Sequence, residues 1–121
     1  MKTELTIRES AKLIDLGLAP RLASTRKVEY DENFTPCYHA VFSLIDILSI
    51  LPKEIVADTI MGEDFLCALA IKWDEDRKVW YCGYGCLPHP LNVGESPELI
   101  DALYSLLVWL LESKIINLKE K

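Results

Sequence analysis

Hydrophobic positions near the start of the chain recur with the period of a helix. In TIRESAKLIDLGL, residues 6–18, apolar residues fall three and four positions apart, as on one face of a helix. Thr6 and Glu9 have the spacing of a capping box, and Gly17 can adopt the left-handed conformation that ends a helix. The pattern predicts a first helix that begins at Thr6.

A second helix is predicted in FSLIDILSILP, residues 42–52. Ser43 is a candidate N-cap, Asp46 suits the first turn, and Pro52 ends the helix at Leu51. The segment is almost entirely apolar, so we expect most of its circumference to be covered. The stretch before it, residues 19–41, has no clear period, and we expect a short helix or strand to be hidden there.

The pattern changes to strands over residues 55–93. IVADTIM, DFLCALAIKW and KVWYCGYGC are separated by the turn-like GE and DEDR, and PLNV is a candidate for a short fourth strand. A last helix is predicted in ESPELIDALYSLLVWLLESK, with Ser96 as N-cap and Pro97 at the first helical position. The fold class is therefore α+β: one domain, residues 1–121, in which helices pack on an antiparallel three-stranded meander. The order of elements is helix, an unassigned stretch, helix, three strands, helix.

The composition indicates which classes of protein this chain can belong to. Half of the 121 residues are hydrophobic, 26% are charged, and the net charge is −6. This balance is typical of a globular protein and disfavours a broad nucleic-acid or anionic-membrane surface. MKTELTIRES has no apolar core of a secretory signal, and the apolar run 99–111 is shorter than the about 20 residues that cross a bilayer. We therefore expect a cytoplasmic protein, no membrane partner, and reduced cysteines.

One segment, WYCGYGCLPHP, contains candidate metal ligands in Cys82, Cys86 and His89. In an extended strand the two cysteines lie about 13 Å apart, too far to share one zinc ion. A zinc site would need a sharp bend at Gly83 and Gly85. We interpret the cysteines as structural thiols and expect no metal site.

Hairpin geometry gives this segment a register. If residues 75–78 form the loop, Trp73 pairs with Trp80, and Cys67 lies opposite Cys86, close enough to oxidise in air. The same register predicts a core face consisting of Cys67, Leu69, Ile71, Cys82 and Tyr84. Gly83 and Gly85 on the other face would leave room for a helix or a partner to approach closely.

No arrangement of residues indicates catalysis. Cys37 and His39 are two positions apart, about 6.6 Å in an extended segment, which is too far for a hydrogen bond. His89 is flanked by two prolines, and a Cys–His nucleophilic pair would need a contact that the sequence does not show. We therefore expect a protein that is not an enzyme and has no cofactor.

The N-terminal segment offers an alternative function. LTIRESAKLIDLGLAPR resembles the start of the MerR- and excisionase-type winged helix-turn-helix modules, in which Pro20 and Arg21 would begin a recognition helix. The resemblance implies a small DNA-binding regulator that uses a degenerate motif at residues 6–27. Two additional residues before Gly17 and the acidic net charge depart from that pattern.

The C-terminal helix suggests an interaction surface. It is apolar around nearly its whole circumference, so it must be buried on more than one side. Either residues 19–41 cover its second face or another subunit does. We predict self-association, as a homodimer, through a set of five residues: Tyr104, Leu107, Val108, Trp109 and Leu111.

Four stretches together resemble a group of small uncharacterised proteins of prophages and mobile elements in Bacteroidetes-type gut bacteria. They are TIRESAKLIDLGL, PCYHAVFSLIDILSILPKEI, WYCGY and ELIDALYSLLVWLLESKII. The resemblance implies no activity, cofactor or functional residue. It implies an accessory role in the cytosol, with a protein partner that the sequence does not identify.

Overall fold

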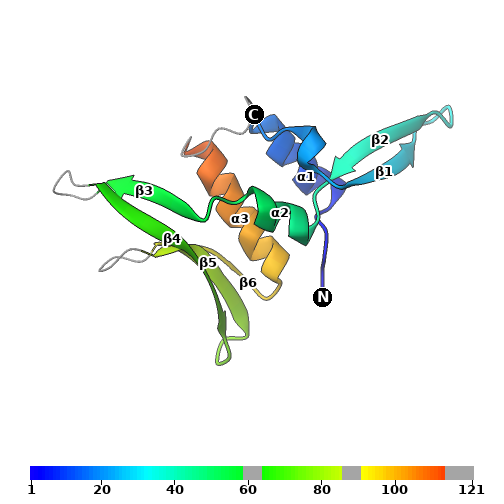
Figure 1. Cartoon of the computed structure of the whole chain (residues 1–121). Coiled ribbons are helices and arrows are strands. Elements are labelled where there is room, and N and C mark those ends of the chain that lie inside the picture. Colours follow the sequence, from blue (N-terminus) through cyan, green and yellow to red (C-terminus); the bar gives the residue numbers. More distant parts are fainter. Residues whose placement is uncertain (59–63, 86–90, 114–121) are drawn as a thin grey trace.

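The computed structural model describes residues 1–58, 64–85 and 91–113 of the chain. This part contains three α-helices, a four-stranded antiparallel sheet and a separate two-stranded antiparallel sheet, so the α+β class is confirmed. The helices lie between the two sheets, and the two-stranded sheet projects away from the rest of the molecule (Figure 1).

The first helix, α1 (Ile7–Asp15), begins where the sequence predicts. Thr6 and Glu9 form the capping box in both directions, with the Thr6 hydroxyl accepting a hydrogen bond from the Glu9 amide. Gly17 has a φ of +116°, a conformation that other residues rarely adopt. The buried face of α1 is formed by Ser10 and Leu13, so the predicted helix is confirmed.

The stretch that sequence reasoning left unassigned contains three elements. A 3₁₀ turn (Pro20–Leu22) leads into the strands β1 (Thr25–Tyr30) and β2 (Pro36–Val41), which pair as an antiparallel hairpin. These strands form the separate sheet.

The second helix, α2 (Leu44–Ile50), starts at Ser43 as predicted. The Asp46 carboxylate accepts from the Ser43 amide, and the Ser43 hydroxyl accepts from the Asp46 amide. The prediction that most of its circumference is covered is wrong. Ile45 is 74% exposed and Leu48 is 40% exposed, because α2 packs through one face only.

The large sheet contains β3 (Glu54–Asp58), β4 (Asp64–Asp74), β5 (Val79–Gly85) and β6 (Leu91–Ser96), side by side in that order. The meander therefore has four strands instead of three, and the candidate fourth strand is confirmed. The predicted register is also confirmed, with Trp73 paired to Trp80. Cys86 lies outside the described residues, and so does its predicted pairing with Cys67.

The last helix, α3 (Leu99–Glu112), begins later than predicted. Its N-cap is Glu98 instead of Ser96, because Ser96 is the last residue of β6. The Ser96 hydroxyl accepts a hydrogen bond from the Glu98 amide at 3.2 Å. Ser96 therefore still satisfies an amide at the start of the helix.

The core lies between α3 and the inner face of the large sheet. Cys67, Cys82 and Tyr84 are buried on this face, as the register predicts, but Ile71 is 39% exposed. Ile71 lies on β4, whereas α3 packs mainly on β5 and β6. A close approach to α3 occurs at Gly94 of β6, and none is found at Gly85. A Cβ atom at Gly94 would lie 2.0 Å from the Ala102 carbonyl oxygen, whereas one at Gly85 would meet open space.

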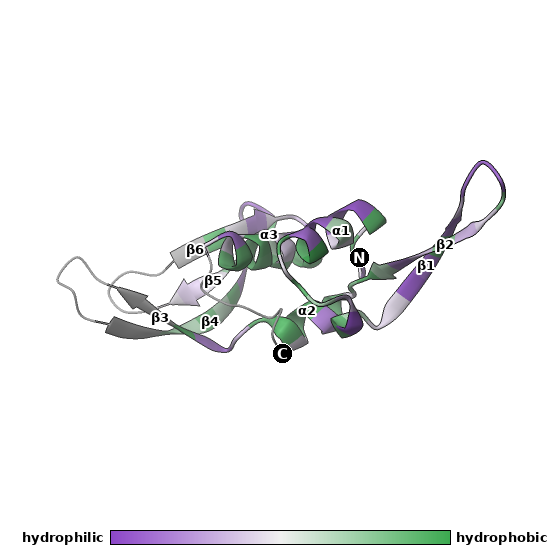
Figure 2. Cartoon of the chain, turned by 90° about the horizontal axis from the view of Figure 1, so that it is seen from above, coloured by the Kyte–Doolittle hydropathy of each residue, from purple (hydrophilic) through white to green (hydrophobic). Residues whose placement is uncertain are grey.

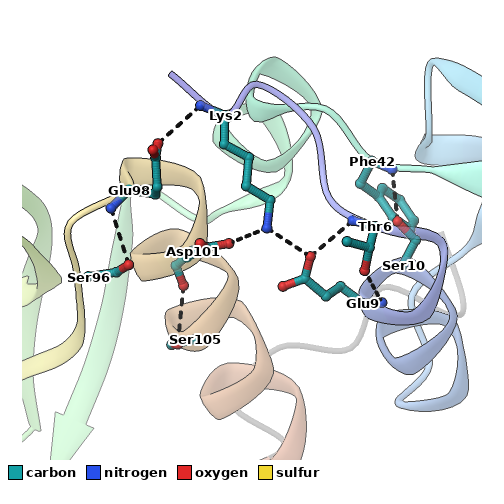
Figure 3. Close-up of polar contacts among 9 residues, drawn as sticks. All are labelled: Lys2, Thr6, Glu9, Ser10, Phe42, Ser96, Glu98, Asp101 and Ser105. Atoms are coloured by element: carbon teal, nitrogen blue, oxygen red, sulfur yellow. Dashed lines mark hydrogen bonds and ion pairs between the residues drawn. The ribbon is translucent and has the colours of Figure 1, made fainter.

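A group of charges near the N-terminus connects three segments of the chain (Figure 3). The Lys2 ammonium lies 2.7 Å from the Asp101 carboxylate of α3 and 3.1 Å from the Glu9 carboxylate of α1. The Lys2 amide donates to the Glu98 carboxylate at 3.0 Å. Burial disfavours the charge on Glu9, but the Thr6 amide and the Lys2 ammonium together hold the pKa of Glu9 below its ordinary value.

Candidate functional site: the projecting hairpin

The hairpin of β1 and β2 presents large apolar side chains to solvent. Its strands extend beyond the helical layer on the side opposite the large sheet (Figures 1 and 2). Val28 and Tyr38 are directly opposite each other in the register, and Tyr30 follows Val28 on the same face. These three side chains and Phe34 at the tip form the hairpin patch, with exposed fractions between 42% and 84%.

The tip of the hairpin is shaped by Asp31. Its carboxylate accepts hydrogen bonds from the amides of Asn33 and Thr35, at 2.8 and 2.9 Å. This arrangement holds Phe34 in a left-handed conformation with a φ of 58°, which is uncommon for a residue other than glycine. The side chain of Phe34 is 84% exposed. A bulky aromatic group is therefore held in solvent at the end of the hairpin.

The base of the hairpin is fixed to the helices. The Asp46 carboxylate, at the start of α2, accepts from both the amide and the hydroxyl of Ser24, each at 2.9 Å. Directly after β2, the Phe42 amide donates to the buried Ser10 hydroxyl of α1 at 3.2 Å, and the Phe42 carbonyl accepts from the Leu5 amide. These bonds orient the hairpin relative to the rest of the molecule.

The second face of the hairpin is charged. Lys27 forms an ion pair with Glu4, and the His39 imidazole lies 3.2 Å from the Glu29 carboxylate. The Cys37 thiol is exposed on this face, and the Thr35 carbonyl lies 3.8 Å from its sulfur. His39 therefore contacts a surface carboxylate instead of Cys37.

The cysteine-containing segment is an extended strand up to Gly85, as predicted. The Cys82 thiol is buried and donates to the Ala102 carbonyl of α3 at 3.0 Å, and burial raises the pKa of this thiol to about 12. Cys86 and His89 lie outside the described residues. Within residues 1–58, 64–85 and 91–113, no cluster of three or more metal-ligating side chains is found.

The five residues predicted as a self-association surface lie on α3, but two of them are in the core. Leu107 is fully buried and Leu111 is 6% exposed, whereas Tyr104, Val108 and Trp109 are partly buried and pack against the core. The large sheet covers one side of α3, while α1 and α2 lie on the other (Figure 1). Part of the second apolar face is therefore covered within one chain, by α1 and α2.

The helix-turn-helix prediction for residues 6–27 is wrong in its second half. The first helix is present, but Pro20 and Arg21 lie in a 3₁₀ turn that leads into β1. No recognition helix follows, because the sequence from Thr25 to Tyr30 pairs with β2 instead.

Within the described part of the chain, no helix has the length and apolar character needed to cross a membrane. Comparisons with protein-family models, with curated proteins and with solved structures find no match to this chain. The resemblance to proteins of prophages and mobile elements therefore stays a prediction.

Proposed function

We propose that this chain is a small non-enzymatic interaction protein that self-associates, and that the β1–β2 hairpin is its contact surface. The observation that supports this proposal is the hairpin patch, in which Val28, Tyr30, Phe34 and Tyr38 are all exposed on one projecting element. Exposed clusters of large apolar side chains mark interaction surfaces, and aromatic residues are enriched in them.

The energetics of a lone hairpin favour the same interpretation. A two-stranded sheet is marginally stable in water unless further strands or a packed face support it. The hairpin base has such support through Ser24 and Phe42, but Val28 to Tyr38 extend into solvent. A partner that covers this part would supply the missing contacts.

The chemistry-bearing side chains support an interaction role better than catalysis. Cys82 has a raised pKa and stays a protonated thiol at neutral pH, when it is a poor nucleophile. His39 contacts Glu29 at the surface of the hairpin. Nucleic acid is a weaker candidate, because the net charge of the chain is −6.

The test is the molar mass in solution, measured by light scattering after size exclusion over a range of concentrations. We expect a monomer–dimer equilibrium that Tyr30→Ser shifts towards monomer. Ile71→Ser, which removes an exposed apolar side chain from the other sheet, is the matched control and should leave the equilibrium unchanged. A monomer at hundreds of micromolar, or a dimer equally sensitive to both variants, would contradict the proposal.

A further inference from the structure

The outer edge of β1 carries unpaired backbone groups. The Asp31 amide donates to the Thr35 carbonyl across the hairpin at 3.1 Å, so the amide and carbonyl of Asp31 point towards β2. Successive residues of a strand point these groups to opposite sides. The N–H and C=O groups of Arg26, Val28 and Tyr30 therefore point away from β2. The pairing of Tyr30 with Pro36 agrees with this alternation, because Pro36 has no N–H group that could bond to the Tyr30 carbonyl.

The two edges of the hairpin differ. On β2 the outward-pointing positions are Pro36, Tyr38 and Ala40, of which Pro36 has no donor and Ala40 is buried against the body. Proline and cover by other elements are devices that block an edge from pairing. On β1, residues 26–30 are all exposed, and no described strand pairs with this edge. The edge of β1 is therefore the one that can accept another strand.

We propose that β1 pairs antiparallel with β1 of a second copy, so that the two hairpins form one four-stranded intermolecular sheet. This inference rests on the proposed self-association and specifies its geometry. In an antiparallel pair, residues directly opposite each other have their side chains on the same face of the sheet. When the two strands are identical and related by a two-fold axis, one residue must therefore lie opposite its own copy, on that axis. We place Val28 on that axis.

Charge complementarity selects this register. With Val28 opposite its own copy, Lys27 lies opposite Glu29 of the second copy, and symmetry creates this pair twice. Arg26 lies opposite Tyr30 of the second copy, where a guanidinium can stack on the aromatic ring. A shift in either direction places Lys27 opposite Lys27 or Glu29 opposite Glu29, and like charges directly opposite are destabilising.

The same register also gives hydrogen-bond partners to the unpaired backbone groups of β1. The outward N–H and C=O groups of Arg26, Val28 and Tyr30 bond to one another across the axis. Asp31 at the tip reaches the level of Thr25 of the second copy, so Phe34 approaches the base of the other hairpin. Ser24 and α2 lie at that base, where Ile45 is exposed. The edge is shorter than a standard interface requires, so we expect a dissociation constant in the micromolar range or weaker.

Cysteine crosslinking tests the register. In a Cys37→Ser, Cys86→Ser background, Val28→Cys should form a disulfide-linked dimer under mild oxidation, because opposed strand residues lie within about 5.5 Å between Cα atoms. Arg26→Cys alone and Tyr30→Cys alone should not crosslink, since like positions then lie about 13 Å apart. A mixture of these two variants should crosslink to the heterodimer.

Hydrogen exchange on the unmodified chain gives a second, independent readout. The amides of Val28 and Tyr30 should exchange at least about tenfold more slowly at high than at low concentration, because pairing removes them from water. The Phe34 amide, which already bonds to Asp31 within the hairpin, is the internal control.

The outcomes separate the two proposals. A dimer by light scattering in which Val28→Cys does not crosslink, or in which the β1 amides are unprotected, would overturn the β1 pairing and leave self-association standing. A monomer at every concentration would overturn both. A crosslink from Arg26→Cys alone would overturn the register, and binding of a different protein to β1 without self-pairing would overturn the choice of a second copy.

Discussion

At the scale of single residues, the contact between Cys82, Gly94 and Ala102 fixes how closely α3 packs on the sheet. The Cys82 thiol donates to the Ala102 carbonyl at 3.0 Å, and Gly94 leaves the space in which that carbonyl sits. The Cys82 thiol and the absence of a side chain at Gly94 therefore both contribute to the contact with Ala102. This contact predicts the effects of a substitution at Gly94 and of alkaline pH.

The first concerns the space at Gly94. Gly94→Ala should lower the free energy of unfolding by about 1–3 kcal/mol, because the added methyl group would lie 2.0 Å from the Ala102 carbonyl oxygen and 2.6 Å from the Cys82 sulfur. Gly85→Ala is the control, since a Cβ atom there meets nothing within 4 Å. Urea unfolding of both variants measures the difference, and equal destabilisation by the two substitutions would show that α3 does not approach β6 this closely.

The second concerns alkaline pH. The pKa of Cys82 is raised by burial to about 12, from an ordinary value of 9.0. Above pH 9 the thiol ionises more readily in the unfolded chain, so the free energy of unfolding should fall by up to about 1.4 kcal/mol per pH unit. Cys82→Ala should show a shallower decrease between pH 9 and 11. Identical slopes in the two proteins would mean that the Cys82 thiol is not buried.

The sequence predicted this part of the site well, for a physical reason. Alternation along a strand placed Cys82 and Tyr84 on one face, and the short loop after Trp73 fixed the register. The close contact between Gly94 and α3 could not be predicted in the same way, because it depends on how α3 packs across the sheet. The exposure of Ile71 could not be predicted for the same reason, because a periodic pattern does not show on which strands the covering helix packs.

At the scale of elements, the hairpin depends on its anchor at the start of α2. The Asp46 carboxylate joins three donors: the Ser24 amide, the Ser24 hydroxyl and the Ser43 amide. Burial opposes the charge on Asp46, but these hydrogen bonds hold its pKa below the ordinary value of 3.8. The stabilising contribution is therefore complete above pH 3.8 and is lost as the pH falls through the lowered pKa.

Removing this carboxylate should loosen the hairpin as well as the helix. Asp46→Ala should lower the free energy of unfolding by about 1–2 kcal/mol and increase amide exchange at residues 25–27. Ser49→Ala, which loses only a hydrogen bond to the Ile45 carbonyl on the exposed side of α2, is the matched control. Hydrogen exchange measured by mass spectrometry checks both. Unchanged exchange in β1 would show that the Ser24 contact does not hold the hairpin.

The hairpin was not found from the sequence because neither of its faces forms the core. Val28 and Tyr30 are exposed on one face, and Lys27 and Glu29 on the other, so the usual alternation of buried and solvated positions is missing. The available signal was Asp31 at the start of DENFTP, whose side chain can close a turn. For α3, the apolar circumference correctly predicted burial on more than one side, but it did not show that α1 and α2 supply part of the cover.

At the scale of the whole molecule, the hairpin projects from the rest of the described chain (Figure 1). The helices lie between the large sheet and the hairpin, and β1 and β2 extend to the side opposite the large sheet (Figure 1). A surface that projects in this way can meet a second copy without disturbing the core. We therefore propose that the molecule self-associates through β1.

Reversal of charge across the proposed two-fold axis tests that claim most directly. Sedimentation measurements should show that Lys27→Glu and Glu29→Lys each weaken the dimer by about tenfold, because each places like charges opposite one another. Their surface contacts within the chain, an ion pair with Glu4 and a contact with His39, contribute little to folding. The double variant Lys27→Glu/Glu29→Lys should recover the affinity of the unmodified chain within about twofold. A double variant as weak as the single ones, or single variants without effect, would contradict pairing through β1.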